Sequence, residues 1–399
     1  MFLTALGRVL LIVVVLEVSL GGGGRLFDTG PASPRMVLFG VGLAYTAAAL
    51  LYGRKISREF VFMTAFFVVL SGVSTLIPVL QGQSAVVALG DFKPFAYFFM
   101  LPFFAIAIRD MDDVVLVGRL LKFSALILAA VYLGVMAFWK SGGMTVMQMY
   151  EWLNPAHSAE AEFLFRGDKT FFFKALLYVG VGVFFFVIER SRCWHGVVAT
   201  LLLAIALTMT RGMWLAMFMV LATGAFFISG SQRKGAALAS GLLLVGVVGV
   251  AVINETLPSV AQSNTMRLND LNNLKKAAEA SLSSEASLSS EALTLLFGGG
   301  FGTQVLGRKN IEITYVNLWF KQGLCGLVFW FLPAVYLAWQ MRAIRDAALR
   351  AMAIPYVMAA AFVYTVSFTN PFLTNPIGMA VVLIAMVAVR VARGGAIAP

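Results

Sequence analysis

The sequence contains few charged residues, few histidines and few cysteines. Only 12% of its 399 residues are charged, about half of the roughly 25% found in soluble domains. So few charges cannot cover the surface of a water-soluble fold of this length. This excludes an ordinary cytosolic enzyme, a disordered protein and a nucleic-acid binder that acts in solution. The two histidines and two cysteines, Cys193 and Cys325, form no metal-binding spacing, which argues against a metal site or a disulfide.

Hydrophobic residues dominate instead, with 60% of the chain and a mean hydropathy of +0.88. At about 20 residues per spanning helix, this content is enough for about twelve spans. The apolar runs are continuous rather than alternating, which favours helices over transmembrane strands. We therefore predict an all-α polytopic membrane protein forming a single membrane domain, 1–399. The expected spans are roughly 3–20, 36–53, 60–80, 93–108, 114–138, 171–188, 195–210, 213–229, 236–253, 316–339, 352–368 and 377–392.

The basic residues predict the orientation of these spans. More than half of the 30 lysines and arginines fall in one set of short loops, whereas most of the 19 acids lie elsewhere. Short loops rich in lysine and arginine stay in the cytoplasm, so we expect both termini there. The net charge of +11 is then explained without nucleic acid. Two long segments, 139–170 and 254–315, are expected on the opposite face, where loops of this length are usually functional or disordered.

Three arginines of the opposite face are candidate anion ligands. They are Arg166, Arg211 and Arg267. A guanidinium bonds two phosphate oxygens at once, so three of them around one pocket suit a diphosphate. Arg211 also ends an apolar run, where an arginine is costly without a partner. The residues alone leave an interface anchor and an anion site equally open.

Glu312 lies just before the tenth expected span and is the candidate general base. A carboxylate at this place can accept a proton from a hydroxyl. The alternative is a solvated acid paired with Arg308 or Lys309. Tyr315 and Asn317 follow closely and are candidate sugar ligands, although tyrosine is also common at membrane interfaces.

The glycine-rich segment Phe297–Gly302 lacks the Lys-Ser/Thr of a phosphate-binding P-loop. It is either a flexible re-entry into the membrane or a place where backbone approaches a phosphate or a sugar. The expected spans hold few ionisable residues beyond Glu17 and Lys321. Ion-coupled transporters need such groups near the membrane midplane, so the pattern directs the chemistry to the outer face.

The stretch Thr210–Ala216 (TRGMWLA) resembles the Thr-Arg-Gly-x-Trp-Leu-Ala stretch of the bacterial O-antigen ligase and O-antigen polymerase superfamily (WaaL and Wzy). The order of the features that follow is also similar. A long outer loop with an arginine comes first, then the glycines of Phe297–Gly302, then the Gly323-Leu-Cys-Gly326 of the next helix. By motif the resemblance covers about 205–330, and by topology it covers the whole chain.

The resemblance implies a GT-C-like architecture for lipid-linked glycosyl transfer, with a periplasmic loop cap, in the bacterial inner membrane. The donor would be an undecaprenyl-diphosphate-linked glycan, and no metal or cofactor would be needed. The diphosphate-binding arginines of the family transfer to Arg211 and Arg267, and by loop position alone to Arg166. Glu312 would deprotonate the acceptor hydroxyl, and a single displacement would invert the anomeric carbon.

The acceptor separates the two branches of the superfamily. Ligases resemble one another in a histidine followed by Asn, Ser or Gln, then nine residues and Gly-x-x-Gly. Aligned on Gly323 and Gly326, this sequence has Glu312 at the histidine and Ile313 at its neighbour. This departure favours a polymerase, which extends a lipid-linked repeat unit. The expected partners are the lipid-linked oligosaccharide, membrane lipids and a chain-length regulator, with no nucleic acid. A ligase acting on lipid A–core and a flippase for the same glycan remain as alternatives.

Overall fold

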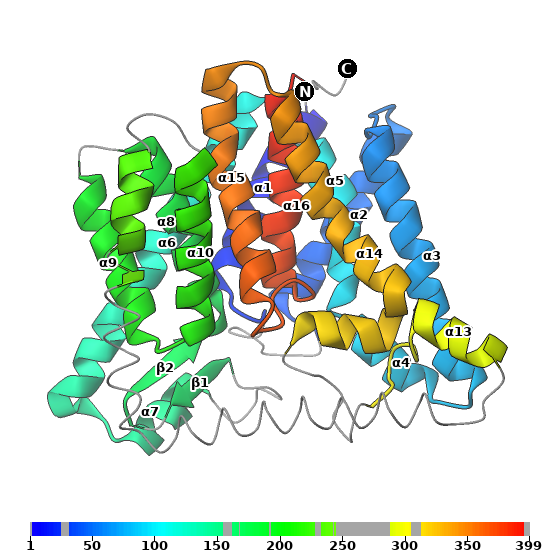
Figure 1. Ribbon diagram of the computed structural model, residues 1–399, viewed down its shortest axis with the longest axis horizontal. Coiled ribbons are helices and arrows are strands. Elements are labelled where there is room, and N and C mark those ends of the chain that lie inside the picture. The colour runs from blue at the N-terminus through cyan, green and yellow to red at the C-terminus, as the bar shows by residue number, and fades with distance from the viewer. Residues whose placement is uncertain are drawn as a thin grey trace.

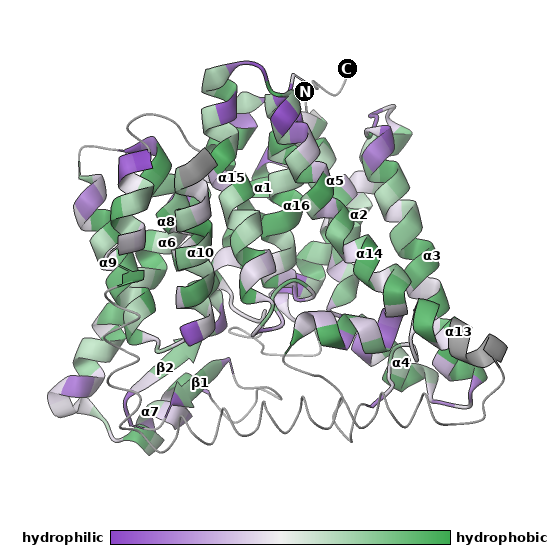
Figure 2. Ribbon diagram, viewed as in Figure 1, coloured by the Kyte–Doolittle hydropathy of each residue, from purple (hydrophilic) through white to green (hydrophobic). Residues whose placement is uncertain are grey.

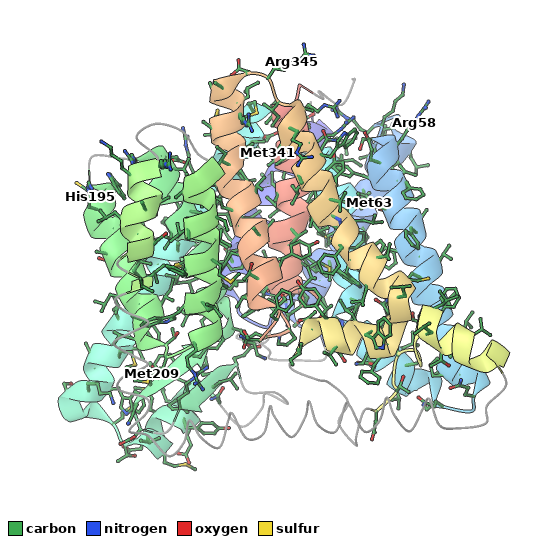
Figure 3. All side chains as sticks on the ribbon, in the orientation of Figure 1. Arg58, Met63, His195, Met209, Met341 and Arg345 are labelled. Atoms are coloured by element: carbon green, nitrogen blue, oxygen red, sulfur yellow. The ribbon has the colours of Figure 1, made fainter. Side chains whose placement is uncertain are left out.

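The computed structural model describes residues 2–24, 32–154, 162–166, 168–190, 193–227, 233–241, 243–244, 288–304 and 313–394. Helices stand side by side in a bundle, and α1 begins and α16 ends at the same end of it (Figure 1). Hydrophobic residues run along the helices, and hydrophilic ones gather near their ends (Figure 2). Arg58 and Arg345, from the basic loops, lie at one end of the bundle and Met209 at the other (Figure 3).

Six helices in the described part are long and apolar enough to cross a membrane, by length and composition. They are α1 (Phe2–Leu20), α2 (Pro34–Leu51), α3 (Arg58–Leu80), α6 (Met111–Phe138), α14 (Thr314–Ala343) and α15 (Ala347–Val366). A seventh candidate is a bent pair, α4 (Ala85–Phe92) and a 3-10 turn continuing into α5 (Leu101–Ala107), with 50° between its halves. The shorter apolar helices are α9 (Trp194–Leu207), α10 (Arg211–Phe227) and α16 (Pro376–Ala392).

The expected helical class is confirmed, but the expected twelve spans are not reached in the described part. The run at 93–108 is one half of a bent pair, because the helical stretch Phe95–Ala107 meets α4 at 50°. The run at 171–188 begins as a strand and a 3-10 turn, so its helix α8 covers only Leu177–Glu189. The run at 236–253 lies partly outside the described residues. An apolar run predicts burial, but it does not tell how much of the run is one straight helix.

A small sheet also corrects the all-helical expectation. The strands β1 (Phe163–Arg166) and β2 (Thr170–Phe173) pair antiparallel, with Phe163 opposite Phe173 and Arg166 opposite Thr170. Within segment 139–170, the described residues also form a π-helical turn and the short helix α7 (Val146–Leu153). We call the end of the bundle with this sheet, the α9–α10 turn and the α15–α16 turn the hairpin end (Figure 1).

The helix α16 forms the centre of the bundle (Figure 1). It is hydrophobic on all sides, and nearly all of its side chains are buried, as expected for a helix surrounded by other helices. Asn375 begins it by accepting a hydrogen bond from the amide of Ile377, and Pro376 occupies its first turn. This N-cap fixes the residue at which the α15–α16 turn ends and α16 begins.

The helix α14 is broken at Gly323, whose φ of 61° and ψ of −157° are not helical. Its first part lies across the hairpin end, and its second part runs along the bundle (Figure 1). The glycine-rich segment after α13 (Leu288–Phe297) packs into this break. A Cβ on Gly323 would lie 2.5 Å from the backbone of Leu296, and one on Gly300 would lie 2.3 Å from Pro78. Only glycine permits such close backbone contact.

The amides of the glycine-rich segment are used inside the protein. Those of Gly299 and Gly300 donate to carbonyls of α14, and that of Phe301 donates to the carbonyl of Ser74. The amide of Gly302 donates to the carboxylate of Asp91 at 2.8 Å. Because these donors are already paired, they are not offered to a phosphate. The segment joins α3, α4 and α14 by packing.

Candidate functional site

The motif around Arg211 folds into a tight turn between α9 and α10. The hydroxyl of Thr208 accepts a hydrogen bond from the amide of Thr210 at 3.2 Å, and Met209 has a positive φ of 52°. The indole of Trp214 donates to the carbonyl of Ile205 at 3.0 Å, which ties the first turn of α10 to α9. Arg211 is the first residue of α10 and is exposed at the hairpin end. Figure 3 labels the adjacent Met209 there.

The β-hairpin brings Arg166 to the same turn. Its guanidinium donates a hydrogen bond to the carbonyl of Met209. Opposite it in the sheet, the hydroxyl of Thr170 donates to the carbonyl of Leu207 at 2.6 Å and contacts the hydroxyl of Tyr132 at 2.8 Å. The hairpin is therefore anchored to the α9–α10 turn. Arg166 contacts the carbonyl of Met209, which lies two residues before Arg211 in the chain.

Gly212, next to Arg211, lies against the α15–α16 turn. A Cβ on Gly212 would lie 2.0 Å from the hydroxyl oxygen of Thr369 and 3.2 Å from the amide nitrogen of Asn370. The glycine of the Thr-Arg-Gly motif therefore allows close contact between α10 and this turn. Thr369 and Asn370 were not predicted. Asn370-Pro371 is a turn signal, but the sequence pattern does not tell which helix the turn contacts.

The same turn holds the start of α14. The amide of Thr314 donates to the carbonyl of Ser367 at 3.2 Å, and its hydroxyl donates to the carbonyl of Asn370 at 3.2 Å. Ile313, which follows Glu312 in the chain, is the N-cap of α14. The α15–α16 turn therefore lies between the two segments that carry most of the candidate residues, although they are about a hundred residues apart in sequence.

The two candidate sugar ligands differ in their surroundings. Tyr315 donates its hydroxyl to the carbonyl of Tyr364 at 2.7 Å, and its ring stacks on Phe331. These contacts favour a packing role for Tyr315. Asn317 is 4% exposed, and its side-chain oxygen has no hydrogen-bond partner among the described residues. Buried polar atoms are nearly always paired. This oxygen can therefore accept a hydrogen bond from a bound ligand.

We call Arg166, Arg211, Thr369, Asn370, Thr314 and Asn317 the turn cluster. It combines two cations with neutral polar groups, a set suited to a phosphate joined to a sugar. The structure brings Arg166 and Arg211 together and joins them through one turn to the segment with Asn317. Glu312 and Arg267 lie outside the described residues.

A buried ion pair near the break in α14 was not anticipated. Lys321 is fully buried, and its ammonium group lies 2.6 Å from the carboxylate of Asp91 in α4. That carboxylate also accepts the amide of Gly302. The sequence showed a lysine in an apolar span, but its partner is 230 positions away. The pair joins the two broken helices, α14 and the α4–α5 unit.

No protein-family model matches the chain. An O-antigen polymerase of Shigella flexneri is 24% identical over 394 residues, which cover 94% of this chain and 93% of that protein. The chain is similar to an O-antigen polymerase. The similarity spans almost the whole of both chains. Together with the apolar helices of the described part, this similarity supports a multi-pass protein of the bacterial inner membrane.

Proposed function

We propose that this protein is a polysaccharide polymerase of the O-antigen or exopolysaccharide kind. It is a glycosyltransferase that moves an undecaprenyl-diphosphate-linked glycan onto a lipid-linked repeat unit at the periplasmic face. The full-length similarity to an O-antigen polymerase supports the general role. The observation that carries the site is the α15–α16 turn, which packs against Gly212 beside Arg211 and bonds Thr314 at the start of α14.

The arginines of the turn cluster act on the leaving group. Arg166 and Arg211, joined by Arg267 from the long loop 254–315, bind the diphosphate of the donor. As the glycosidic C–O bond breaks, negative charge grows on the departing diphosphate, and fixed guanidinium groups stabilise this charge most in the transition state. Arg166 is held through its bond to the Met209 carbonyl, so its guanidinium is positioned before the donor binds.

Glu312 acts on the acceptor. It stands two residues before Thr314, whose amide and hydroxyl are bonded to the α15–α16 turn. Its carboxylate takes the proton of the acceptor hydroxyl as that oxygen forms a bond to the anomeric carbon. The diphosphate leaves with the electron pair of the broken C–O bond, so one displacement inverts the anomeric configuration. The side-chain oxygen of Asn317, which has no partner among the described residues, accepts a hydrogen bond from a sugar hydroxyl, and Tyr315 positions α14 next to it.

The proposed orientation places the hairpin end in the periplasm and both termini in the cytoplasm. Arg58 and Arg345, from the loops rich in lysine and arginine, lie opposite Met209 (Figure 3), which agrees with the positive-inside rule. Segments 139–170 and 254–315 then form a periplasmic cap over a GT-C-like membrane domain. A chain-length regulator is a candidate partner there.

The deciding experiment supplies purified protein with a lipid-linked repeat unit alone and resolves the products on a gel. A ladder of longer lipid-linked glycans is expected from a polymerase. Transfer that appears only when lipid A–core is added would instead identify a ligase. Folded protein that forms neither product but moves the lipid-linked glycan across a vesicle bilayer would contradict both enzyme assignments and identify a flippase.

A further inference from the structure

Arg35, in the first turn of α2, is a buried cation outside the turn cluster. It is 6% exposed. Its Nε donates to the carboxylate of Glu17 in α1, at 3.0 Å and 3.2 Å to the two oxygens. The two terminal nitrogens, Nη1 and Nη2, are buried and have no hydrogen-bond partner among the described residues. Glu17 therefore uses only one edge of the guanidinium.

The Nη1 and Nη2 atoms of Arg35 need a hydrogen-bond acceptor. An arginine stays charged at any ordinary pH and carries five N–H donors. Leaving buried donors unpaired is costly, and native structures rarely tolerate it. A planar pair of N–H donors fits two oxygens of one phosphate group better than any neutral ligand. The empty edge of Arg35 is therefore suited to an anion.

An apolar groove between α1 and α2 is lined by the neighbours of Arg35, among them its ion-pair partner Glu17 and the preceding Pro34, although Arg35 itself does not line it. It encloses about 400 Å³ and is lined by Val13, Leu16, Glu17, Leu20, Gly21, Gly24, Pro34 and Leu38. Its lining is apolar except at Glu17. A Cβ on Gly24 would lie 3.2 Å from the central carbon of the guanidinium, so the turn Gly21–Gly24 lies against Arg35. A ligand that fits both features has an anionic head and a hydrocarbon chain.

The β-hairpin connects this groove to the turn cluster. The amide of Gly23 donates to the carboxylate of Glu162 at 2.6 Å, directly before β1. At the other end of β1, Arg166 contacts the carbonyl of Met209. The strand between them advances three residues, about 10 Å. The turn that lies against Arg35 and the α9–α10 turn are therefore in contact with opposite ends of the same short strand.

We propose that the α1–α2 groove binds the acceptor lipid, with its diphosphate on Arg35 and its polyprenyl chain along the apolar lining. This inference rests on the proposed polymerase function, in which two lipid-linked diphosphates must be bound at once. The donor diphosphate departs during the reaction and belongs with the arginines of the turn cluster. The acceptor diphosphate keeps its glycan throughout the reaction and gains no charge. A buried cation that binds it, without stabilising a transition state, therefore suits this role.

Binding of undecaprenyl diphosphate, without a glycan, tests the number of sites independently of activity. Because removing Arg35 alone would leave Glu17 as an unpaired buried acid, the test variant is the double substitution Glu17→Gln with Arg35→Gln. Native mass spectrometry is expected to detect two bound lipids in the unaltered protein and one in the double variant. Arg211→Ala is also expected to leave one. One lipid in the unaltered protein, or two in the double variant, would overturn the proposal.

A groove variant tests the chain rather than the head. Leu38→Trp fills the groove without changing any charge and is expected to remove the same lipid as the double variant. Val37→Trp is the matched control, because Val37 neighbours it on α2, is 54% exposed and does not line the groove. Thermal unfolding of each variant shows that it is folded. Equal lipid loss in both tryptophan variants would contradict the groove assignment.

Kinetics separate acceptor from donor. A repeat unit that lacks the hydroxyl to be glycosylated serves only as donor, and intact repeat unit at low concentration then serves as acceptor. The double variant is expected to raise the KM for acceptor about tenfold, the loss typical of a charged hydrogen bond, with the donor KM unchanged. Equal shifts for both, or none, would refute the assignment. Two bound lipids without any product would instead count against the proposed polymerase function.

Discussion

Gly212 and Thr369 are in such close contact that any side chain on Gly212 would collide with the threonine hydroxyl, only 2.0 Å from the Cβ position. This contact locks the first turn of α10, where Arg211 lies, to the turn between α15 and α16. The same turn bonds Thr314. A single contact between small residues therefore sets the distance between the arginines and the start of α14.

Gly212→Ala is expected to reduce polymer formation about tenfold or more, because the overpacked contact, costing about 1–3 kcal/mol, moves Arg211 away from its place. The measurement is the rate of ladder formation alongside the unfolding temperature. Gly196→Ala is the control, since a Cβ on Gly196 in α9 meets nothing within 4 Å. An unchanged rate with Gly212→Ala would show that the contact does not position the site.

Arg211→Ala is expected to lower the rate of glycan transfer about 100-fold, the usual effect of removing a group that stabilises charge in the transition state. Arg211→Lys should recover part of this rate, because the charge remains while the two-pronged geometry is lost. Initial rates with purified repeat unit measure both. Arg233→Ala, at an exposed position expected on the cytoplasmic side, serves as the control, and a similar loss there would argue against a specific role.

Glu312→Gln tests the base in the same assay. The amide cannot take the proton of the acceptor hydroxyl, so the rate is expected to fall by about 100-fold or more while undecaprenyl diphosphate still binds. Elongation at the ordinary rate would rule out Glu312 as the base.

Asn317→Leu is expected to weaken catalysis with little loss of stability. The side-chain oxygen has no partner in the described protein, so its removal breaks no hydrogen bond there, and leucine has a similar size. If this oxygen accepts a sugar hydroxyl, the KM for the repeat unit should rise about tenfold. Unfolding temperature and KM are measured on the same preparation. A large drop in the unfolding temperature with unchanged KM would assign Asn317 to packing.

Lys321→Met is expected to destabilise the protein by about 3–5 kcal/mol, because it leaves the largely buried Asp91 without its cation. Adding Asp91→Asn should recover most of this loss, since asparagine is neutral and keeps an oxygen for the amide of Gly302. Thermal unfolding in detergent compares the variants. Lys93→Met, at an exposed lysine nearby, should have little effect. A double variant no more stable than Lys321→Met would contradict this account.

The sequence by itself determined the class of protein and the beginnings of several of its helices. Long apolar runs require helices in a membrane, because a backbone in hydrocarbon must satisfy its own hydrogen bonds. Polar residues before proline or an apolar run set the starts of α2, α6 and α16. The Thr-Arg-Gly motif marked the α9–α10 turn, because its local hydrogen bonds lie within a few residues.

Only the tertiary structure decided which of these elements meet. The apolar run was predicted as one straight span over 316–339, whereas packing of the glycine-rich segment breaks the helix at Gly323. The partners of Lys321 and Arg35, and the turn beside Gly212, are likewise set by contacts between distant segments. A hydrophobic pattern records whether a residue is buried, but not against which residue, because apolar burial has no direction.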